Sequence, residues 1–318
     1  MKSWRQIQRE NFTNGKDLAS FLNLKEDIPH FSFFPLNVPK HLAEKMEKGN
    51  PNDPLLLQFL PSNKESQTIP GFVEDPVADR DYQKTPRLLK KYKGRALLIT
   101  TSACVMNCRF CFRQNYPYLS DKNFTQEIDI IQNDPTITEV ILSGGDPLSL
   151  SDETLHSLII SLEKIPHLNL LRFHTRFPIG IPERITPEFL DILEKTRLQP
   201  IFVLHTNHPN ELDDFLFTAL KKIPAPILTQ TVLLKGVNDN IETLKTLFLT
   251  LVNHGILPYY LHQLDRVKQA SHFEVPIEKG KALIEALRAE LPGYALPTYV
   301  QEVPHEQSKT PLNALKTQ

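Results

Sequence analysis

The sequence is poor in cysteine, with three residues of this type, and its charges almost cancel, because 36 Lys and Arg face 37 Asp and Glu. A formal net charge of −1 provides no excess of positive charge to attract nucleic acid or anionic lipid. No apolar run approaches the roughly 20 residues of a membrane span, and the N-terminus has no apolar core of signal-peptide length. We therefore expect a cytoplasmic protein that acts on a small molecule.

The three cysteines, Cys104, Cys108 and Cys111, all lie between positions 104 and 111. Their number is odd and their spacing is too tight for the disulfide framework of a secreted domain. We interpret them as ligands or as a redox site.

The residue pattern of the sequence changes near residue 95. Nine of the 26 prolines lie in residues 1–90, which prevents long helices there and favours short helices and loops. After this point, short β-rich runs alternate with helical patterns. The six predicted strands are Ala96–Thr101, Glu139–Leu142, Asn169–Thr175, Ile201–His205, Ile227–Leu234 and Leu257–Leu261.

Helical patterns of the right period separate these strands. In the segment 241–252, the apolar residues Ile241, Leu244, Leu247, Phe248, Leu251 and Val252 share one helical face. Repeats of this kind predict an α/β fold in which a parallel sheet with right-handed crossovers is curved or closed into a barrel. In such folds the reacting groups lie beyond the C-terminal ends of the strands.

The cysteines follow the first predicted strand with the spacing C-x3-C-x2-C. An iron–sulfur cube normally takes four cysteines, so three of them leave one iron able to bind another ligand. A zinc site is the alternative, but a closed structural zinc site needs a fourth ligand, and this spacing matches no common zinc ribbon. The loop, with Phe110 before the last cysteine, resembles the signature of the radical S-adenosylmethionine superfamily. That resemblance implies a four-iron cluster whose open iron is chelated by S-adenosylmethionine.

Ser143-Gly-Gly-Asp-Pro147 follows the second predicted strand. Without side chains, Gly144 and Gly145 let a ligand approach the backbone, although the motif alone could be just a turn. It resembles the glycine-rich strip that holds the methionyl amino group of the cofactor, which implies contacts from Gly144, Gly145 and Asp146.

Four further stretches resemble the lysine 2,3-aminomutase family, and the likeness runs from about Pro54 to Pro311. They are His205-Thr-Asn-His208-Pro209, Gln230-Thr-Val-Leu-Leu-Lys-Gly-Val-Asn-Asp239, Pro258-Tyr-Tyr-Leu-His-Gln-Leu-Asp265 and Ser308-Lys-Thr-Pro311. The family implies a partial (β/α)6 TIM-like barrel. We expect an extension over residues 1–90, a barrel core over 91–290, and a C-terminal segment over 291–318 that binds pyridoxal phosphate.

Lys309 lies in a polar tail, where an isolated lysine is ordinarily a solvated charge. The resemblance makes it the lysine that forms a Schiff base with pyridoxal 5'-phosphate. The family's glycine-rich lead-in to this lysine is replaced here by Pro304-His-Glu-Gln-Ser308. The course of the backbone into the site is therefore not predicted.

The resemblance assigns substrate contacts to Arg113, Asp265 and Glu302. The planar fork of Arg113, two residues beyond Cys111, suits a carboxylate, so it is expected to hold the α-carboxylate of the substrate. Asp265 and Glu302 match positions at which the family places acids against the ε-ammonium of lysine, and the family often has aspartate at the second position. Each acid could instead be exposed or form an ordinary ion pair.

Three further residues are candidate cofactor contacts. His205 and Gln230 fall near the ends of predicted strands, although a lone histidine is more often satisfied by the core or by water. Arg95, just before the first predicted strand, is a candidate for the phosphate of pyridoxal phosphate, because phosphate favours arginine.

The stretches Cys111-Phe-Arg113 and Pro258-Tyr-Tyr-Leu-His262 most resemble the branch of the family that makes β-lysine for modification of translation elongation factor P. This implies an isomerase that converts free L-lysine to β-lysine, an electron donor of the flavodoxin or ferredoxin type, and a separate ligase that uses the product. The sequence is compatible with a homo-oligomer and does not establish the oligomeric state. The alternatives are a radical aminomutase for another amino acid, such as glutamate or arginine, and a non-catalytic iron–sulfur or zinc regulatory protein. The acids at 265 and 302 argue against an acidic substrate, and the joint presence of Gly144-Gly-Asp146 and Lys309 disfavours the regulatory protein.

Overall fold

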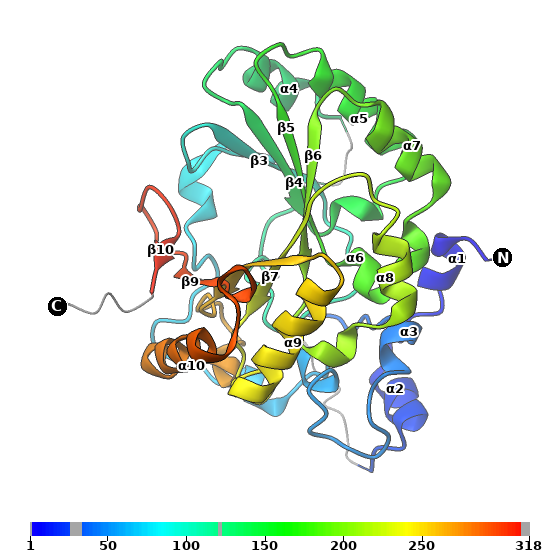
Figure 1. Cartoon of the computed structure of the whole chain (residues 1–318), viewed down its shortest axis with the longest axis vertical. Helices are drawn as coiled ribbons and strands as arrows, with labels where there is room; N and C mark the ends of the chain where they lie inside the picture. Colours follow the sequence, from blue (N-terminus) through cyan, green and yellow to red (C-terminus); the bar gives the residue numbers. More distant parts are fainter. Residues whose placement is uncertain (1, 26–33, 120–122, 313–318) are drawn as a thin grey trace.

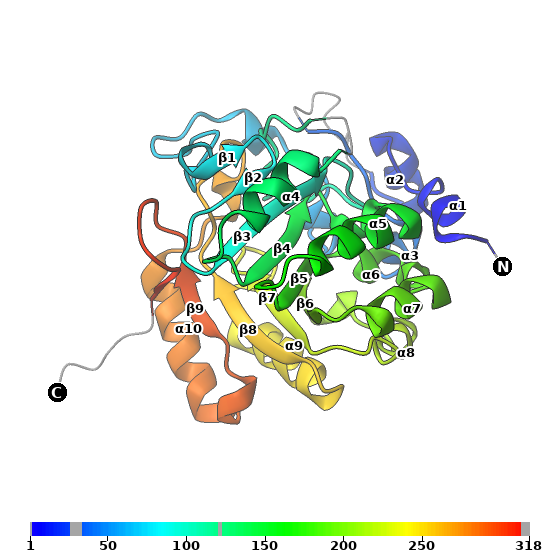
Figure 2. The ribbon, with the colours of Figure 1, turned by 90° about the horizontal axis from the view of Figure 1, so that it is seen from above.

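A curved sheet with helices on its outer side forms the centre of the molecule (Figures 1 and 2). The structure, a computed structural model, describes residues 2–25, 34–119 and 123–312. The helices within these ranges are α1 (Trp4–Gln8), α2 (Gly15–Leu22), α3 (Lys40–Ala43), α4 (Thr125–Gln132), α5 (Asp152–Glu163), α6 (Phe177–Gly180), α7 (Pro187–Lys195), α8 (Asp214–Leu220), α9 (Ile241–Asn253) and α10 (Ile277–Glu290).

The sheet has its strands in sequence order. They are β1 (Gln83–Thr85), β2 (Leu88–Leu89), β3 (Arg95–Thr101), β4 (Glu139–Gly144), β5 (Leu170–Thr175), β6 (Gln199–His205), β7 (Ile227–Val232), β8 (Leu257–His262), β9 (Thr298–Gln301) and β10 (Thr310–Pro311). All neighbours from β3 to β9 are parallel, whereas β1, β2 and β10 pair antiparallel at the two edges. Viewed from above, the strands follow an arc (Figure 2).

The structure confirms the α/β class and the six predicted strands, which correspond to β3–β8. The predicted helical face over 241–252 lies in α9, where Leu244, Leu247 and Leu251 are buried. The parallel sheet contains a seventh strand, β9, that the sequence did not predict, and it lies in the segment 291–318 expected to carry Lys309.

The two faces of the sheet differ in polarity. In β5, the buried Phe173 alternates with the partly exposed Arg172 and His174. Phe173 stacks on Phe202 of β6, and both contact Phe189 of α7, so these rings face the helical layer. The polar side chains between them therefore face the inside of the arc. An inner face of this kind is suited to bind a polar ligand.

The N-terminal extension packs against the cysteine loop and fixes its backbone. The side-chain amide of Asn37 donates to the carbonyl of Cys104 at 3.2 Å, and that of Asn11 donates to the carbonyl of Val105 at 2.8 Å. Helix α3 contacts α6, and α1–α3 lie on the opposite side of the molecule from β10 (Figures 1 and 2). The extension is thus part of the support of the cysteine loop.

Among the described helices, none has both the length and the apolar character needed to span a membrane.

Candidate active site

The cysteine loop leaves the C-terminal end of β3 and brings its three thiols near one another. The pKa of Cys104 is raised well above its ordinary value by burial, by Asp146 and by the other two cysteines. Burial and the nearby Cys108 raise the pKa of Cys111 to about 11. Within the described residues, no three His, Cys, Asp or Glu side chains are arranged to hold a single metal ion. A four-iron cube binds each cysteine through a different iron.

The glycine-rich strip packs directly against this loop. A Cβ added at Gly145 would lie 2.4 Å from the carbonyl oxygen of Ala103, and one at Gly144 would lie 2.6 Å from that of Thr101. The backbone N–H of Gly145 donates to the same Thr101 carbonyl at 2.7 Å. The glycines at 144 and 145 are therefore required for the close approach of two backbone segments. Their contact with S-adenosylmethionine stays a prediction.

The carboxylate of Asp146 connects the strip to the end of β5. It accepts hydrogen bonds from the backbone N–H of Arg176 at 2.7 Å, from the hydroxyl of Thr175 at 2.8 Å and from the backbone N–H of Leu148 at 3.0 Å. Asp146 is 3% exposed. Protein donors thus occupy the carboxylate that the sequence assigned to cofactor binding.

Arg113 is buried and already ion-paired. Its Nε donates to Asp79 at 2.8 Å, and its Nη1 donates to the hydroxyl of Ser143 at 3.3 Å. Within the described part of the chain, its Nη2 has no hydrogen-bond partner. The guanidinium is thus oriented by the N-terminal extension and by the end of β4, and its Nη2 edge remains for the predicted carboxylate.

Lys309 lies beside Glu302 near the C-terminal end of β9. Its Nζ donates to Oε2 of Glu302 at 2.7 Å, while Lys91 contacts the other oxygen at 2.5 Å and the hydroxyl of Tyr92 donates to it as well. Desolvation opposes ionisation of Glu302, but the two lysines and Tyr92 outweigh it and lower its pKa to about 2. Glu302, predicted to bind the substrate ammonium, is therefore paired here with two cations of the protein.

Asp265 follows β8 and is close to Lys309. Desolvation, with smaller contributions from Glu302 and Asp79, raises its pKa to about 7 although Lys309 opposes the shift. No described residue forms a salt bridge with Asp265, whereas Glu302 has two such partners. Of the two predicted acids, Asp265 is the one whose carboxylate contacts no cation of the described residues.

Three histidines lie on the inner face, and two of them, His174 and His262, are near Lys309. Among the described residues, His174 of β5 and His262 of β8 have buried Nε2 atoms without a hydrogen-bond partner. Burial and then nearby cations, including Lys309, lower the pKa of both rings well below the ordinary value. Burial lowers the pKa of His205 to about 3. All three rings are thus neutral near pH 7, and the unpartnered nitrogens of two of them mark a polar interior in which a ligand would supply partners.

The structure brings His205 and Gln230 together, because these residues are paired across β6 and β7. His205 also contacts the ring of Phe110 in the cysteine loop, with 5.6 Å between centroids. Arg95 begins β3, at the end of that strand away from the cysteines, and its guanidinium lies 4.9 Å from the ring centre of Tyr92. Since Tyr92 bonds Glu302, Arg95 lies on the Lys309 side of the interior.

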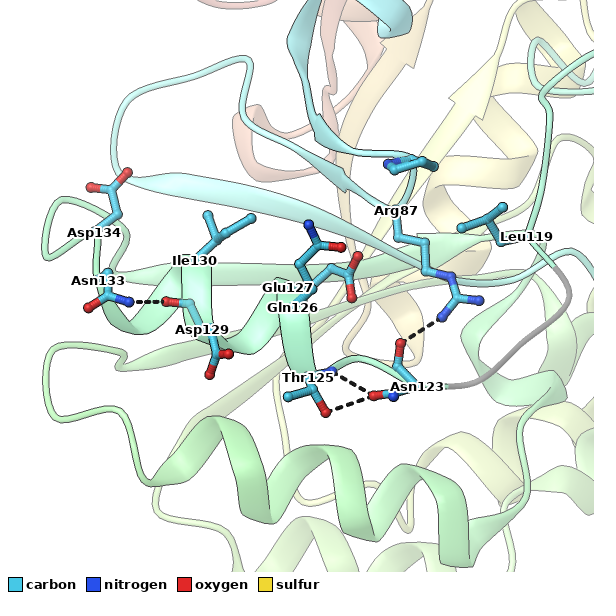
Figure 3. Close-up of a pocket in the computed structure, with 11 residues that line it drawn as sticks. Arg87, Leu119, Asn123, Thr125, Gln126, Glu127, Asp129, Ile130, Asn133 and Asp134 are labelled. Carbon is cyan, nitrogen blue, oxygen red and sulfur yellow. Dashed lines mark hydrogen bonds between the residues drawn. The ribbon is translucent and has the colours of Figure 1, made fainter.

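A separate open groove of about 1070 Å³ lies along α4 (Figure 3). Its lining includes Arg87, Asn123 and Asp134. None of the residues predicted from the sequence to bind a cofactor or the substrate lines it.

Known proteins align with most of this chain. No family model matches the chain. The chain is 42% identical to the L-lysine 2,3-aminomutase of Haemophilus influenzae, over 97% of this chain and 95% of that protein. It is 41% identical to the L-lysine 2,3-aminomutase of Escherichia coli K12, over 88% and 84% of the two chains. The chain belongs to the L-lysine 2,3-aminomutase family.

More distant relatives also align over most of this chain. The L-lysine 2,3-aminomutase of Clostridium subterminale is 37% identical over 97% of this chain and 77% of its own length. Among solved structures, a radical SAM methyltransferase from Sphaerobacter thermophilus has a TM-score of 0.46 and 14% identity, over 67% of this chain and 68% of that chain.

Lysine 2,3-aminomutases are isomerases, and the family uses a four-iron cluster, S-adenosylmethionine and pyridoxal phosphate. The described residues fit these groups. A loop with three thiols faces a glycine-rich strip, and a lysine lies among unpartnered polar atoms on the same inner face.

Sequence reasoning missed several residues that shape this interior. They are Asp79, Lys91, Tyr92, Arg172, His174, Arg176 and His262. The alternation of β5 contained a signal, because Arg172 and His174 interrupt an apolar strand at every second position. Asp79, Lys91 and Tyr92 had no such signal, since they lie in irregular segments before β3 and reach the site only through the fold.

Proposed function

We propose that this chain is an L-lysine 2,3-aminomutase that converts free L-α-lysine to β-lysine, and that the β-lysine serves to modify translation elongation factor P through a separate ligase. The observation that carries this proposal is the placement of Lys309, Asp265 and Arg113 around one polar interior next to the cysteine loop. A cationic anchor and an acidic anchor in the same interior as Lys309 suit a substrate with a carboxylate at one end and an ammonium at the other.

Each residue has a definite part in this proposal. Cys104, Cys108 and Cys111 hold the cluster, Arg113 binds the α-carboxylate, and Asp265 binds the ε-ammonium. Glu302 contributes to the ammonium site once one of its two lysine partners is displaced. Arg95, His205 and Gln230 contact the cofactors.

The reaction needs radical chemistry, because the C3 hydrogen of lysine is too weakly acidic for a side-chain base to remove. When bound, the cluster with S-adenosylmethionine supplies hydrogen-atom abstraction, and pyridoxal phosphate carries the migrating nitrogen. The protein orients the substrate through Arg113 and Asp265 and excludes water through the buried inner face.

We further propose that free lysine is the substrate and that protein-attached lysine is not. Attachment through the carboxyl group would remove the anion that Arg113 binds and leave its buried charge poorly matched. The cluster needs an electron donor of the flavodoxin or ferredoxin type and reduced thiols, which supports a cytoplasmic location.

The deciding experiment is turnover after anaerobic reconstitution with iron, sulfide, pyridoxal phosphate and S-adenosylmethionine, with dithionite as reductant. Mass spectrometry would follow β-lysine formation from free L-lysine and, separately, from α-lysylated elongation factor P. Glutamate and arginine serve as competing substrates, and Cys108→Ala serves as the inactive control. Faster conversion of the protein-attached form would overturn the substrate assignment. Stoichiometric zinc without reconstitutable iron would overturn the enzyme assignment.

A further inference from the structure

Cys108 is connected to a buried arginine. Arg176, the first residue after β5, donates from Nη1 to Sγ of Cys108 at 2.8 Å. Its Nη2 donates to Oε1 of Gln58 at 2.7 Å and to Oε1 of Glu211 at 3.0 Å. Arg176 is 5% exposed, and Gln58 and Glu211 are fully buried. A fixed cation therefore contacts the sulfur of one cysteine.

The surrounding network fixes the guanidinium in this orientation. Glu211 accepts hydrogen bonds from the hydroxyl of Thr206 at 3.0 Å and from the backbone N–H of Asn207 at 3.2 Å. The Asn207 amide donates to Gln58 Oε1 at 3.0 Å, so the partners of Arg176 are themselves held. Asn207 belongs to the His205-to-Pro209 motif, which thereby gains a role that sequence reasoning did not assign.

The contact distinguishes Cys108 from the other two cysteines. Across the described ranges, neither Cys104 nor Cys111 receives a hydrogen bond from a side chain. Arg176 and the residues that hold it come from three separate parts of the chain, namely the extension (Gln58), the end of β5 (Arg176) and the segment after β6 (Glu211). Such a contact tunes a metal centre through its ligand and does not touch the substrate.

We propose that Arg176 is a positioning residue that fixes the Cys108 thiolate as a cluster ligand and raises the reduction potential of the cluster, and that Glu211 moderates this effect. The inference rests on the proposed cluster site. A hydrogen bond and a positive charge at a ligating sulfur stabilise the reduced cluster, which carries one more negative charge after it accepts an electron from the donor. A carboxylate near the same sulfur lowers the reduction potential of the cluster.

Potentiometric titration of the anaerobically reconstituted protein, followed by the electron paramagnetic resonance signal of the reduced cluster, tests this inference. Arg176→Gln should shift the midpoint potential to a more negative value. Arg176→Lys, which keeps the charge, should recover part of that shift. Glu211→Gln should shift the potential to a more positive value, because the cation is then less compensated.

Opposite signs distinguish electrostatic tuning from damage to packing, which would not reverse with the sign of the charge removed. Arg184→Gln is the matched control, because Arg184 is also a buried arginine but pairs with Asp152 and, among the described residues, donates to no cysteine. The midpoint potential of this variant should equal that of the parent. A parent-like potential in Arg176→Gln, or shifts of the same sign in the Arg176→Gln and Glu211→Gln variants, would overturn the inference. If Arg176→Gln retains no cluster, the sign of the shift in midpoint potential in Glu211→Gln decides alone. Absence of iron from the parent would instead defeat the cluster proposal itself.

Discussion

At Asp265, the raised pKa of one carboxyl group affects both the free energy of unfolding and the predicted binding of the substrate. Its pKa of about 7 is well above the ordinary aspartate value of about 4. Between these two pH values the folded protein binds more protons than the unfolded chain, so stability falls as pH rises from about 4 to 7. The cost of the ionised carboxylate is then fully present above pH 7.

We therefore expect Asp265→Asn to be more stable than the parent at pH 8. The gain should be on the order of a few kcal/mol, because one pKa unit corresponds to about 1.4 kcal/mol. It should vanish towards pH 4, where the parent carboxyl is protonated in the folded state. Urea denaturation of both proteins at pH 4.5, 6 and 8 measures the difference. An equal difference at all three values would contradict the raised pKa.

The same variant should lose most of its turnover of lysine. An amide cannot balance the ε-ammonium, and losing one partner of a desolvated charge pair costs roughly 2–5 kcal/mol in binding. In the parent, kcat/KM for lysine should rise with pH as Asp265 ionises near pH 7. Steady-state kinetics across this range is the measurement. An unchanged kcat/KM in Asp265→Asn would remove Asp265 from the site.

Lys309 should carry pyridoxal phosphate. The measurement is borohydride reduction followed by peptide mapping. The parent should carry a pyridoxyl label on Lys309, and Lys309→Ala should carry no pyridoxyl label. Lys91 is the sharpest control, because it contacts the same Glu302 carboxylate as Lys309. A label that persists in Lys309→Ala and disappears in Lys91→Ala would assign the cofactor to the other lysine.

At the scale of elements, β3 and β4 position the cysteine loop by a contact between backbones. The strip at 144–145 leaves no room for a side chain, since the nearest atoms belong to the backbone of residues 101–103. Backbone atoms cannot move aside as a flexible side chain can. The loop and the strip therefore form one unit, and a side chain added at either glycine has to displace the start of the cysteine loop.

Gly145→Ala should accordingly lower the amount of iron that the protein retains after reconstitution. The added methyl group would lie within 2.4 Å of the Ala103 carbonyl oxygen, so the loop has to shift. Gly293→Ala is the matched control, because a Cβ there has no heavy atom within 4 Å. Iron and sulfide analysis, with the cluster absorbance, gives the comparison. Equal iron content in the two variants would show that the strip does not determine the position of the cysteines.

At the scale of the whole molecule, a buried ion pair joins the N-terminal extension to the cysteine loop of the barrel. Arg109, the residue after Cys108, donates from Nε to Glu65 at 2.8 Å, and the two residues are 1% and 5% exposed. The backbone N–H of Arg109 also donates to the carbonyl of Gln58 at 2.8 Å. The extension thus holds the loop both through its backbone and through a buried charge.

Glu65→Gln should lower the free energy of unfolding by on the order of 3–5 kcal/mol, because it leaves a buried guanidinium without its counter-charge. Urea denaturation measures this loss. Asp191→Asn breaks the exposed pair with Lys195 and should change stability by less than about 0.5 kcal/mol. Similar losses in both variants would mean that the extension does not stabilise the cysteine loop in this way.

The sequence by itself determined the six central strands, the α/β class and the position of the cysteine loop after β3. These features depend on local periodicity and on the short spacing between cysteines, which neighbouring residues specify without help from the rest of the fold. The family motifs extended this to Lys309, Asp265 and Arg113, whose roles stay predictions.

Only the tertiary structure decided which charges meet. Glu302 is paired with Lys91, more than 200 residues away in sequence, and Arg176 reaches Cys108 across the barrel. The strand β9 is short, and it is a strand because it pairs with β8. No local pattern encodes such contacts, because they form only when folding brings distant segments together. A buried charge without a partner is unfavourable, so each contact depends on the whole surrounding structure.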